Sequence, residues 1–271
     1  MLKKLIINAD DFGYTPGVTY GIIEAHKQGI VSSTTALTVC DFFEEAMELR
    51  KVLAPDLAVG VHLTLTLRGA KPLLPVEEVP SLVNEKGEFL TQQEFADKVD
   101  LEEVYREWDA QIARFYETGY KPDHLDSHHN VHGKNEEILF VALKLAEKYN
   151  LPLRNCSRTV ETEGFLKNYG AIKTTDRMLP SFYGEGSTKE ELFAILDRVE
   201  QSTQETTFEM NCHPAFIDPS LKASSSYCEK RIEEFEILTA ANLATELSNR
   251  HIDLVNYSLF DAESTQGSQN V

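Results

Sequence analysis

Short strand-like segments alternate with helical segments along most of this 271-residue chain. Strands are expected at 5–9, 33–39, 57–67, 124–127, 151–154, 207–212 and 252–255, and helices at 17–29, 42–53, 101–118, 135–149, 189–203 and 227–247. Repeated strand–helix units with apolar strands predict a parallel sheet covered by helices. We therefore expect an α/β fold, a (β/α) barrel that is regular, distorted or incomplete, with the carboxyl ends of its strands converging on one face.

The chain is long enough to bury one large core, and it shows no internal repeat and no dividing linker. We expect a single domain over residues 1–260, followed by a polar tail at 261–271. Three prolines fall within residues 68–88, which predicts a long loop there. Residues 157–183 fit neither helix nor strand clearly.

Charge and cysteine usage limit the partners and the compartment. Lys plus Arg number 26 and Asp plus Glu number 44, which gives a net charge of −18. Nucleic acids and anionic membranes bind basic patches, so neither is an expected partner. The first eight residues hold only a three-residue apolar run, no segment is long enough to cross a membrane, and the four cysteines form no CxxC pair. These features favour a cytoplasmic protein with reduced cysteines.

Four of the eight histidines lie at positions 124, 128, 129 and 132, with Asp123 and Asp126 between or beside them. Imidazoles beside carboxylates are a common ligand set for catalytic transition metals, so the cluster predicts a hydrolytic metalloenzyme. His128 and His132 would share one face if the segment were helical. A loop is expected instead, because the cluster follows a strand and ends at Gly133. The spacing alone therefore leaves open which imidazoles bind metal and whether Asp126 is a ligand or orients a histidine.

Asp10 and Asp11 directly follow the first expected strand, and Gly13 and Pro16 supply a turn after them. Adjacent strand residues point to opposite sides, so both carboxylates reach one site only where the strand ends. One interpretation gives one carboxylate to the metal and leaves the other as a general base. The alternative is an aspartate pair that caps the following helix.

Two further histidines lie on other strands. His62 interrupts an apolar strand, where a histidine is either a hydrogen-bonded core residue or a ligand. His213 ends the strand at 207–212 and is fixed by Pro214, so it is either a simple turn residue or a general acid, because histidine titrates near neutral pH. Three aromatic side chains, Tyr14, Tyr183 and Phe12, are candidates for stacking on a sugar or for the core.

Several motifs, in this order, resemble the YdjC-like carbohydrate deacetylases from the first strand to Val255. They are Asn8-Ala9-Asp10-Asp11-Phe12-Gly13, Tyr20-Gly21-Ile22-Ile23-Glu24-Ala25, Ser32-Ser33-Thr34-Thr35-Ala36-Leu37, Gly60-Val61-His62, His124-Leu125-Asp126-Ser127-His128-His129, Phe182-Tyr183-Gly184-Glu185 and Cys212-His213-Pro214-Ala215-Phe216-Ile217-Asp218. The resemblance implies an α/β barrel related to polysaccharide deacetylases. It also implies a metal held by Asp11, His62 and His128, with Asp10 as base and His213 as acid. Asn130 departs from the family pattern, which has a third consecutive histidine there, and this departure puts the sugar preference in doubt.

The resemblance further implies removal of N-acetyl groups from a small amino sugar, such as chitobiose or a chitooligosaccharide, with release of acetate. One divalent metal ion is expected: Mg²⁺ by the resemblance, or Zn²⁺ because an Asp with two His suits a transition metal. A homodimer is the default assembly.

Two other functions stay open at this point. One is a metallohydrolase acting on a phosphoester or a cyclic amide, which often uses two metals that the spare His124, His129 and His132 would help to hold. The other is a non-catalytic, metal-dependent sugar-binding protein.

Overall fold

The computed structural model describes residues 3–96, 99–156, 172–203 and 206–261. Most of the predicted tail at 261–271, and residues 157–171 of the unassigned region, lie outside these described residues. The strands are β1 (Lys3–Phe12), β2 (Ser33–Ala36), β3 (Ala58–Leu63), β4 (Leu125–Ser127), β5 (Arg177–Met178), β6 (Thr207–Cys212) and β7 (Ile252–Val255). The α-helices are α1 (Pro16–Gln28), α2 (Phe43–Leu53), α3 (Leu101–Glu117), α4 (Glu136–Tyr149), α6 (Lys189–Glu200), α7 (Pro219–Ser224), α8 (Glu229–Leu238) and α9 (Leu243–Asn249).

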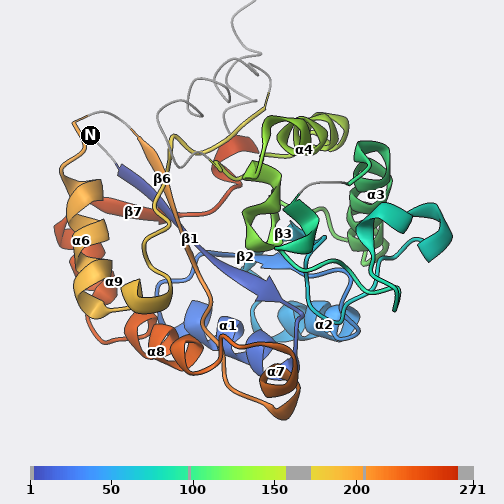
Figure 1. Cartoon of the computed structure of the whole chain (residues 1–271). Helices are drawn as coiled ribbons and strands as arrows, with labels where there is room; N and C mark the ends of the chain where they lie inside the picture. Colours follow the sequence, from blue (N-terminus) through green and yellow to red (C-terminus); the bar gives the residue numbers. More distant parts are fainter. Residues whose placement is uncertain (1–2, 97–98, 157–171, 204–205, 262–271) are drawn as a thin grey trace, which may run out of the picture.

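The strands form one sheet in the order β4-β3-β2-β1-β6-β5, and β7 pairs with the first half of β1. Each of these pairings is parallel. Beyond β4, a single bridge joins Leu125 to Leu153, and the Leu153 N–H donates to Lys173 O at 3.0 Å. These two contacts lie in the space between β4 and β5, so the sheet curls into an incomplete barrel. The helices surround it (Figure 1), which confirms the predicted fold class.

The predicted strands at 33–39 and 57–67 end earlier, at Ala36 and Leu63, and the strand at 151–154 reduces to the bridge at Leu153. The prediction of one long helix at 227–247 is wrong. This segment does not form a single helix. It is two helices, α8 and α9, separated by a turn in which Asn242 has a φ of 76°. Its apolar spacing continues across the turn, and an asparagine adopts this left-handed conformation more readily than most residues.

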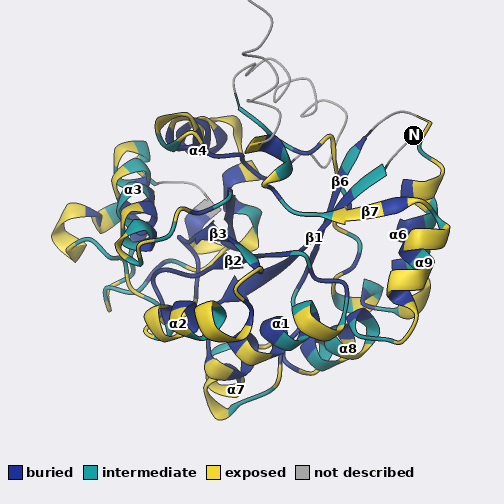
Figure 2. Cartoon of the chain, turned by 180° about the vertical axis from the view of Figure 1, so that it is seen from behind, coloured by how far each residue is buried: buried dark blue, intermediate teal, exposed yellow. Residues whose placement is uncertain are grey.

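The main hydrophobic core lies between the sheet and the helices. Alternate residues of β1, among them Leu5 and Ile7, are fully buried in it. Figure 2 shows β1 buried among helices whose outer faces are exposed, whereas β7 is partly exposed. No helix in the described ranges is both long and apolar enough to cross a membrane.

The inside of the barrel, in contrast, is largely polar. Asn8 donates to Asp10 at 2.9 Å and to Thr35 at 3.1 Å, and Thr35 donates to Asp126 at 3.0 Å. Ile6, on the same face of β1, packs in a separate small cluster with Tyr257 and Phe260. Buried polar groups of this kind are stable only when they are hydrogen-bonded, so the network fixes the positions of its members.

Close packing of α1 positions the segment that follows β6. A Cβ atom on Gly21 would lie 2.5 Å from the Cα of Ala215, so only glycine permits this approach. The Phe216 N–H donates to Gly17 O at 3.0 Å, and the Gly17 N–H donates to Asp218 at 2.6 Å. The chain just after His213 is thereby held against α1.

Candidate active site

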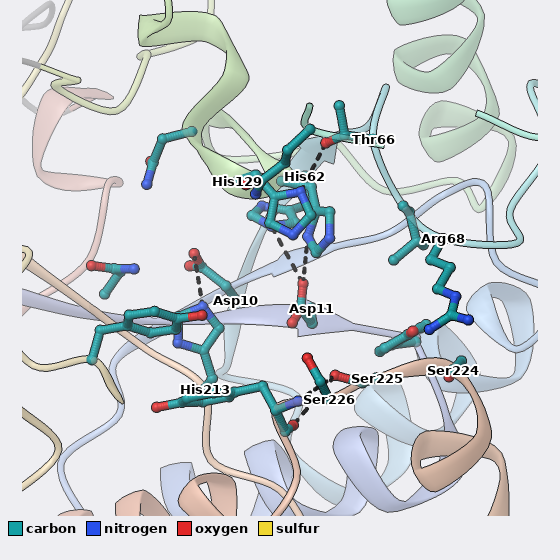
Figure 3. A pocket seen from close by; sticks show the side chains of 18 of the residues that line it. Asp10, Asp11, His62, Thr66, Arg68, His129, His213, Ser224, Ser225 and Ser226 are labelled. Carbon is teal, nitrogen blue, oxygen red and sulfur yellow. Dashed lines mark hydrogen bonds and ion pairs between the residues drawn. The ribbon is translucent and has the colours of Figure 1, made fainter. Parts of the chain in front are cut away.

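A cavity of about 510 Å³ opens where β1, β3, β4 and β6 end. All five residues predicted from the sequence to form the site line it: Asp10, Asp11, His62, His128 and His213. Figure 3 shows the two aspartates between His62 and His129 on one side and His213 on the other. The convergence of distant strand ends on one face, expected for a barrel, is therefore observed.

An extra residue at the end of β1 brings both aspartates to the same cavity. The pairing of β1 with β2 runs from Ala9 opposite Thr34 to Phe12 opposite Ala36, so the register shifts by one residue between them. Asp11 has a φ of 75° in this stretch. A residue inserted into a strand breaks the regular alternation of side chains between the two faces of the sheet, so two neighbouring side chains can reach the same side. The expected turn is thus present, but it begins within the aspartate pair, earlier than Gly13.

Asp11, His62 and His128 are buried and offer ligand atoms that all lie within 4.8 Å of one another. Asp11 Oδ1 lies 3.0 Å from His128 Nδ1 and 3.5 Å from His62 Nε2. Burial lowers the pKa of His128, which keeps its ring neutral, as metal binding requires. This donor set of one carboxylate and two imidazoles could hold a divalent metal ion.

His62 is oriented by the nitrogen that faces away from Asp11. Its Nδ1 lies 2.7 Å from Asp126 Oδ1 and 3.2 Å from the Thr35 hydroxyl. Burial alone would lower the pKa of His62, but the carboxylates around it, Asp126 most strongly and then Asp10 and Asp11, together raise it. A carboxylate that accepts the Nδ1 proton leaves Nε2 free to bind a cation, so Asp126 orients a histidine and is not itself needed as a ligand.

Arg231 of α8 holds the other oxygen of Asp11. Its Nη2 donates to Asp11 Oδ2 at 2.7 Å, and its Nε donates to Tyr227 O at 2.8 Å. Burial would raise the pKa of Asp11, but Arg231 and His128 hold it well below its usual range. Asp11 is therefore ionised, with Oδ1 directed to the histidines and Oδ2 fixed by the guanidinium.

Arg154 holds Asp10 in a similar way. Its Nη1 and Nη2 donate to the two oxygens of Asp10 at 2.9 and 2.7 Å, and it also contacts Asp126 and Glu209 at 2.7 Å each. Burial would raise the pKa of Asp10, but Arg154 lowers it. Charged forks of this kind fix the plane of a carboxylate as well as its charge.

A second group of carboxylates and a histidine, Asp10, His62 and Asp126, also has ligand-type atoms within 4.8 Å of one another. Arg154 already lies against both of these aspartates. Its fixed positive charge would repel a metal ion there. This geometry favours one metal position, at Asp11, over two.

His213 follows β6 on the far side of Asp10. Its Nε2 lies 3.8 Å from Asp10 Oδ2, and its side chain is 14% exposed, toward the cavity. Its backbone N–H donates to the buried carboxylate of Glu234. The ring is thus close to Asp10, on the side away from Asp11, His62 and His128, the metal-type group (Figure 3).

The other histidines of the cluster have different surroundings. His132 is buried, with its Nδ1 2.5 Å from the Ser127 hydroxyl and its Nε2 3.3 Å from Arg154 O. His124 stacks on Tyr257 with ring centroids 3.8 Å apart. His129 lines the cavity and its Nδ1 lies 2.9 Å from the Thr66 hydroxyl. The segment His128–Gly133 is kinked at His129 and Asn130, whose φ values of 58° and 52° are not helical, so His128 and His132 do not form a helical i, i+4 pair.

One aromatic wall borders His213. Tyr183 is 52% exposed and stacks on Tyr227, with ring centroids 4.7 Å apart at 19°. Both rings meet His213 edge-on, at 5.3 and 5.8 Å. Tyr14 also lines the cavity, whereas Phe12 lies in the core.

Sequence reasoning missed Arg154, Arg231 and Glu234. Arg154 is a charged residue at the end of an expected strand, as Asp10 and His213 are polar residues just after theirs, so its position indicated a possible role at the site. Arg231 and Glu234 lie within a helix rich in charged residues, and nothing in that pattern separates buried from solvated charges.

Residues 4–249 match a protein family described as YdjC-like protein. A carbohydrate deacetylase from Enterococcus faecalis (strain V583) is 58% identical over 255 residues, which cover 94% of this chain and 97% of the relative. A carbohydrate deacetylase from Geobacillus stearothermophilus is 40% identical over 260 residues, covering 96% of this chain and 99% of the relative. A crystal structure from Enterococcus faecalis V583, of a protein proposed to cleave cellobiose phosphate, has a TM-score of 0.93 at 57% identity and covers 96% of this chain and 99% of that chain.

Proposed function

Because this chain belongs to the YdjC-like family, we propose that it is a metal-dependent carbohydrate deacetylase that removes N-acetyl groups from amino sugars. Its substrates would be small, such as chitobiose or a chitooligosaccharide, and acetate would be released. The observation that carries the proposal is the grouping of Asp11, His62 and His128 at a cavity that also holds Asp10 and His213. The relatives named carbohydrate deacetylase support the reaction class.

Asp11, His62 and His128 would hold one divalent metal ion, either Mg²⁺ or Zn²⁺. Such an ion, when bound, polarises a carbonyl oxygen and lowers the pKa of a water molecule. Asp10 is the base that takes the proton of the attacking water, and Arg154 keeps its carboxylate in a fixed plane. Because Arg154 also holds Asp10 ionised, the base is in its working form without a prior loss of a proton.

His213 completes the reaction on the leaving group. As the bond between the acetyl carbon and the sugar nitrogen breaks, His213 gives a proton from Nε2 to that nitrogen. Asp10, now protonated, lies 3.8 Å from His213 Nε2 and can return a proton to it. One water is consumed, and an amino sugar and acetic acid leave.

The protein of the Enterococcus faecalis crystal structure is described as cleaving cellobiose phosphate, and cleavage of the glycosidic bond of such a sugar would need different chemistry from this site. Most glycosidases use two carboxyl groups, one of which must be protonated to act as the acid. Asp10 and Asp11 are the carboxyl groups that line the cavity, and their arginines hold the pKa of both below the usual range. Neither is suited to donate a proton at neutral pH, so deacetylation is the function that the site supports best.

The location and assembly are also proposals. The four cysteines are free and buried, which supports the expected cytoplasmic location. A homodimer remains a prediction that light scattering after size-exclusion chromatography can test.

The test is acetate release from acetylated mono- and oligosaccharides by chelator-treated protein to which single metals are added back. We expect release from an N-acetylated amino sugar that depends on the metal. In parallel assays with a phosphoester and a cyclic amide, release of phosphate or ring opening would support another metallohydrolase, and binding of sugar without any product would support a binding protein.

Asp10→Asn gives a sharper test. It should lower kcat by at least about 10³-fold, within the range that a positioned base contributes, because an amide cannot take the proton. Metal binding, measured by calorimetry, should persist. Asp253→Asn, at an exposed position of β7, is the matched control and should retain activity. Near-normal turnover in Asp10→Asn would show that another group is the base.

A further inference from the structure

Glu234 on α8 is fully buried beneath the cavity. One of its carboxylate oxygens accepts from the His213 backbone N–H, and the other accepts from the hydroxyls of Ser187, at 3.0 Å, and Tyr227. Burial and the Glu234 charge raise the pKa of Tyr227, so its hydroxyl keeps the proton that it donates. A buried carboxylate with three donors is held firmly in one orientation.

His213 lies between two carboxylates. Its Nε2 faces Asp10 at 3.8 Å, and its Nδ1 faces Glu234 Oε2 at 4.0 Å. The Nδ1 atom is buried and has no hydrogen-bond partner among the described residues. The separation from Glu234 is about 1 Å longer than a hydrogen bond, and such contacts often tighten only when substrate is bound. A small ring rotation would therefore give Nδ1 its partner.

We propose that Glu234 is the positioning residue of His213: it accepts the Nδ1 proton and so keeps Nε2 directed into the cavity. The inference rests on the proposed function, in which His213 protonates the departing nitrogen. The ring carries a positive charge before it gives up the Nε2 proton, and the fixed carboxylate stabilises that charge. The proton moves from Nε2 to the sugar nitrogen while the C–N bond breaks, and the Nδ1 proton stays on the ring. Glu234 never touches the substrate.

The leaving group provides a readout that a purely structural role would not change. A sugar amine must be protonated to leave, whereas 4-nitrophenolate leaves without a proton. Glu234→Gln should therefore lower kcat on an N-acetylated amino sugar by about 10²-fold, at the lower end of what acid–base groups contribute, with little change in KM. On 4-nitrophenyl acetate the same variant should differ from the native protein by less than about threefold, because the acid is not needed.

Two further variants bracket this effect. Glu233→Gln changes the exposed neighbour of Glu234, which pairs with Lys230, and should leave both rates unchanged. Glu234→Asp keeps the charge and should recover part of the lost rate on the amide. An equal loss on amide and ester in Glu234→Gln, with no recovery in Glu234→Asp, would overturn the proposal in favour of a structural role.

A measurement on the native protein does not depend on any variant folding. Long-range ¹H–¹⁵N spectra of histidine-labelled protein report which ring nitrogen carries the proton, and His213→Gln assigns the signal. We expect a proton on His213 Nδ1. If Nδ1 carries none, the pairing with Glu234 is wrong whatever the activity. If Nδ1 is protonated but the native protein releases no acetate from any amino sugar, the proposed function fails instead.

Discussion

Two segments border the cavity and differ sharply in composition: residues 123–133, which include β4, and residues 227–238, which include α8. The first holds four histidines, yet only His128 belongs to the metal-type group, while His132 and His124 are buried in contacts with the protein itself. The second has an ordinary helical sequence, yet Arg231 and Glu234 hold Asp11 and His213.

The difference lies in what each residue type reveals about its surroundings. A cluster of histidines is conspicuous because the residue is rare, but a histidine also serves as a buried hydrogen-bonding group. Arginine and glutamate are common on helix surfaces, and only the fold shows which of them are buried. A cluster of rare residues such as histidine therefore shows where the site lies. The burial of common charged residues shows which groups fix its side chains in place.

The largest expected effect comes from the one cluster member in the metal-type group. His128→Gln should abolish tight metal binding and lower kcat/KM by about 10³-fold or more, equal to about 4 kcal/mol, because one of three ligands is lost. Calorimetry with Zn²⁺ and acetate release measure the two effects. His129→Gln, the adjacent residue, is the control and should keep the metal affinity. Equal losses in both variants would mean that the cluster acts as a unit.

The next effect concerns stability. Burial lowers the pKa of His132 from 6.5 to about 4. Between these values the unfolded chain binds a proton that the folded protein does not, so unfolding becomes easier as pH falls from 6.5 to 4, by about 3 kcal/mol in total, and the full stability is present above pH 6.5. Urea unfolding at several pH values should show a weaker pH dependence in His132→Gln. If the dependence is the same, His132 does not titrate in this range.

A smaller effect is expected from the inconspicuous segment. Arg231→Met removes the donor that fixes Asp11 Oδ2, and kcat/KM at saturating metal should fall by about 10- to 100-fold, the usual cost of losing a group that orients a ligand. Lys230→Met, its neighbour on α8, should change little. Native activity in Arg231→Met would show that Asp11 does not need its guanidinium partner and would weaken the contrast between the two segments.

Sequence reasoning reached the α/β barrel because the alternation of apolar strands and amphipathic helices is a local property of the chain. The five site residues implied by the family resemblance all line the cavity, among other residues, and four of them, all but His62, were expected at or just beyond strand ends. Sequence reasoning failed at 227–247, where apolar spacing continues through a turn that only tertiary packing imposes. It missed Arg154 as the shared partner of Asp10, Asp126 and Glu209, because those three residues, which are far apart in the sequence, meet only when the strands curl into the incomplete barrel.

The extra residue at the end of β1 limits how a chain of this kind can change over time. Losing one residue between Ala9 and Phe12 would remove the register shift, and gaining one would double it; either change would send Asp10 or Asp11 to the wrong face of the sheet. The spacing of the two aspartates is thus intolerant of insertions and deletions. Surface loops at the cavity, such as the one that carries Arg68, tolerate such changes far better. Relatives should therefore diversify in loop length and sugar preference while this short stretch keeps its length.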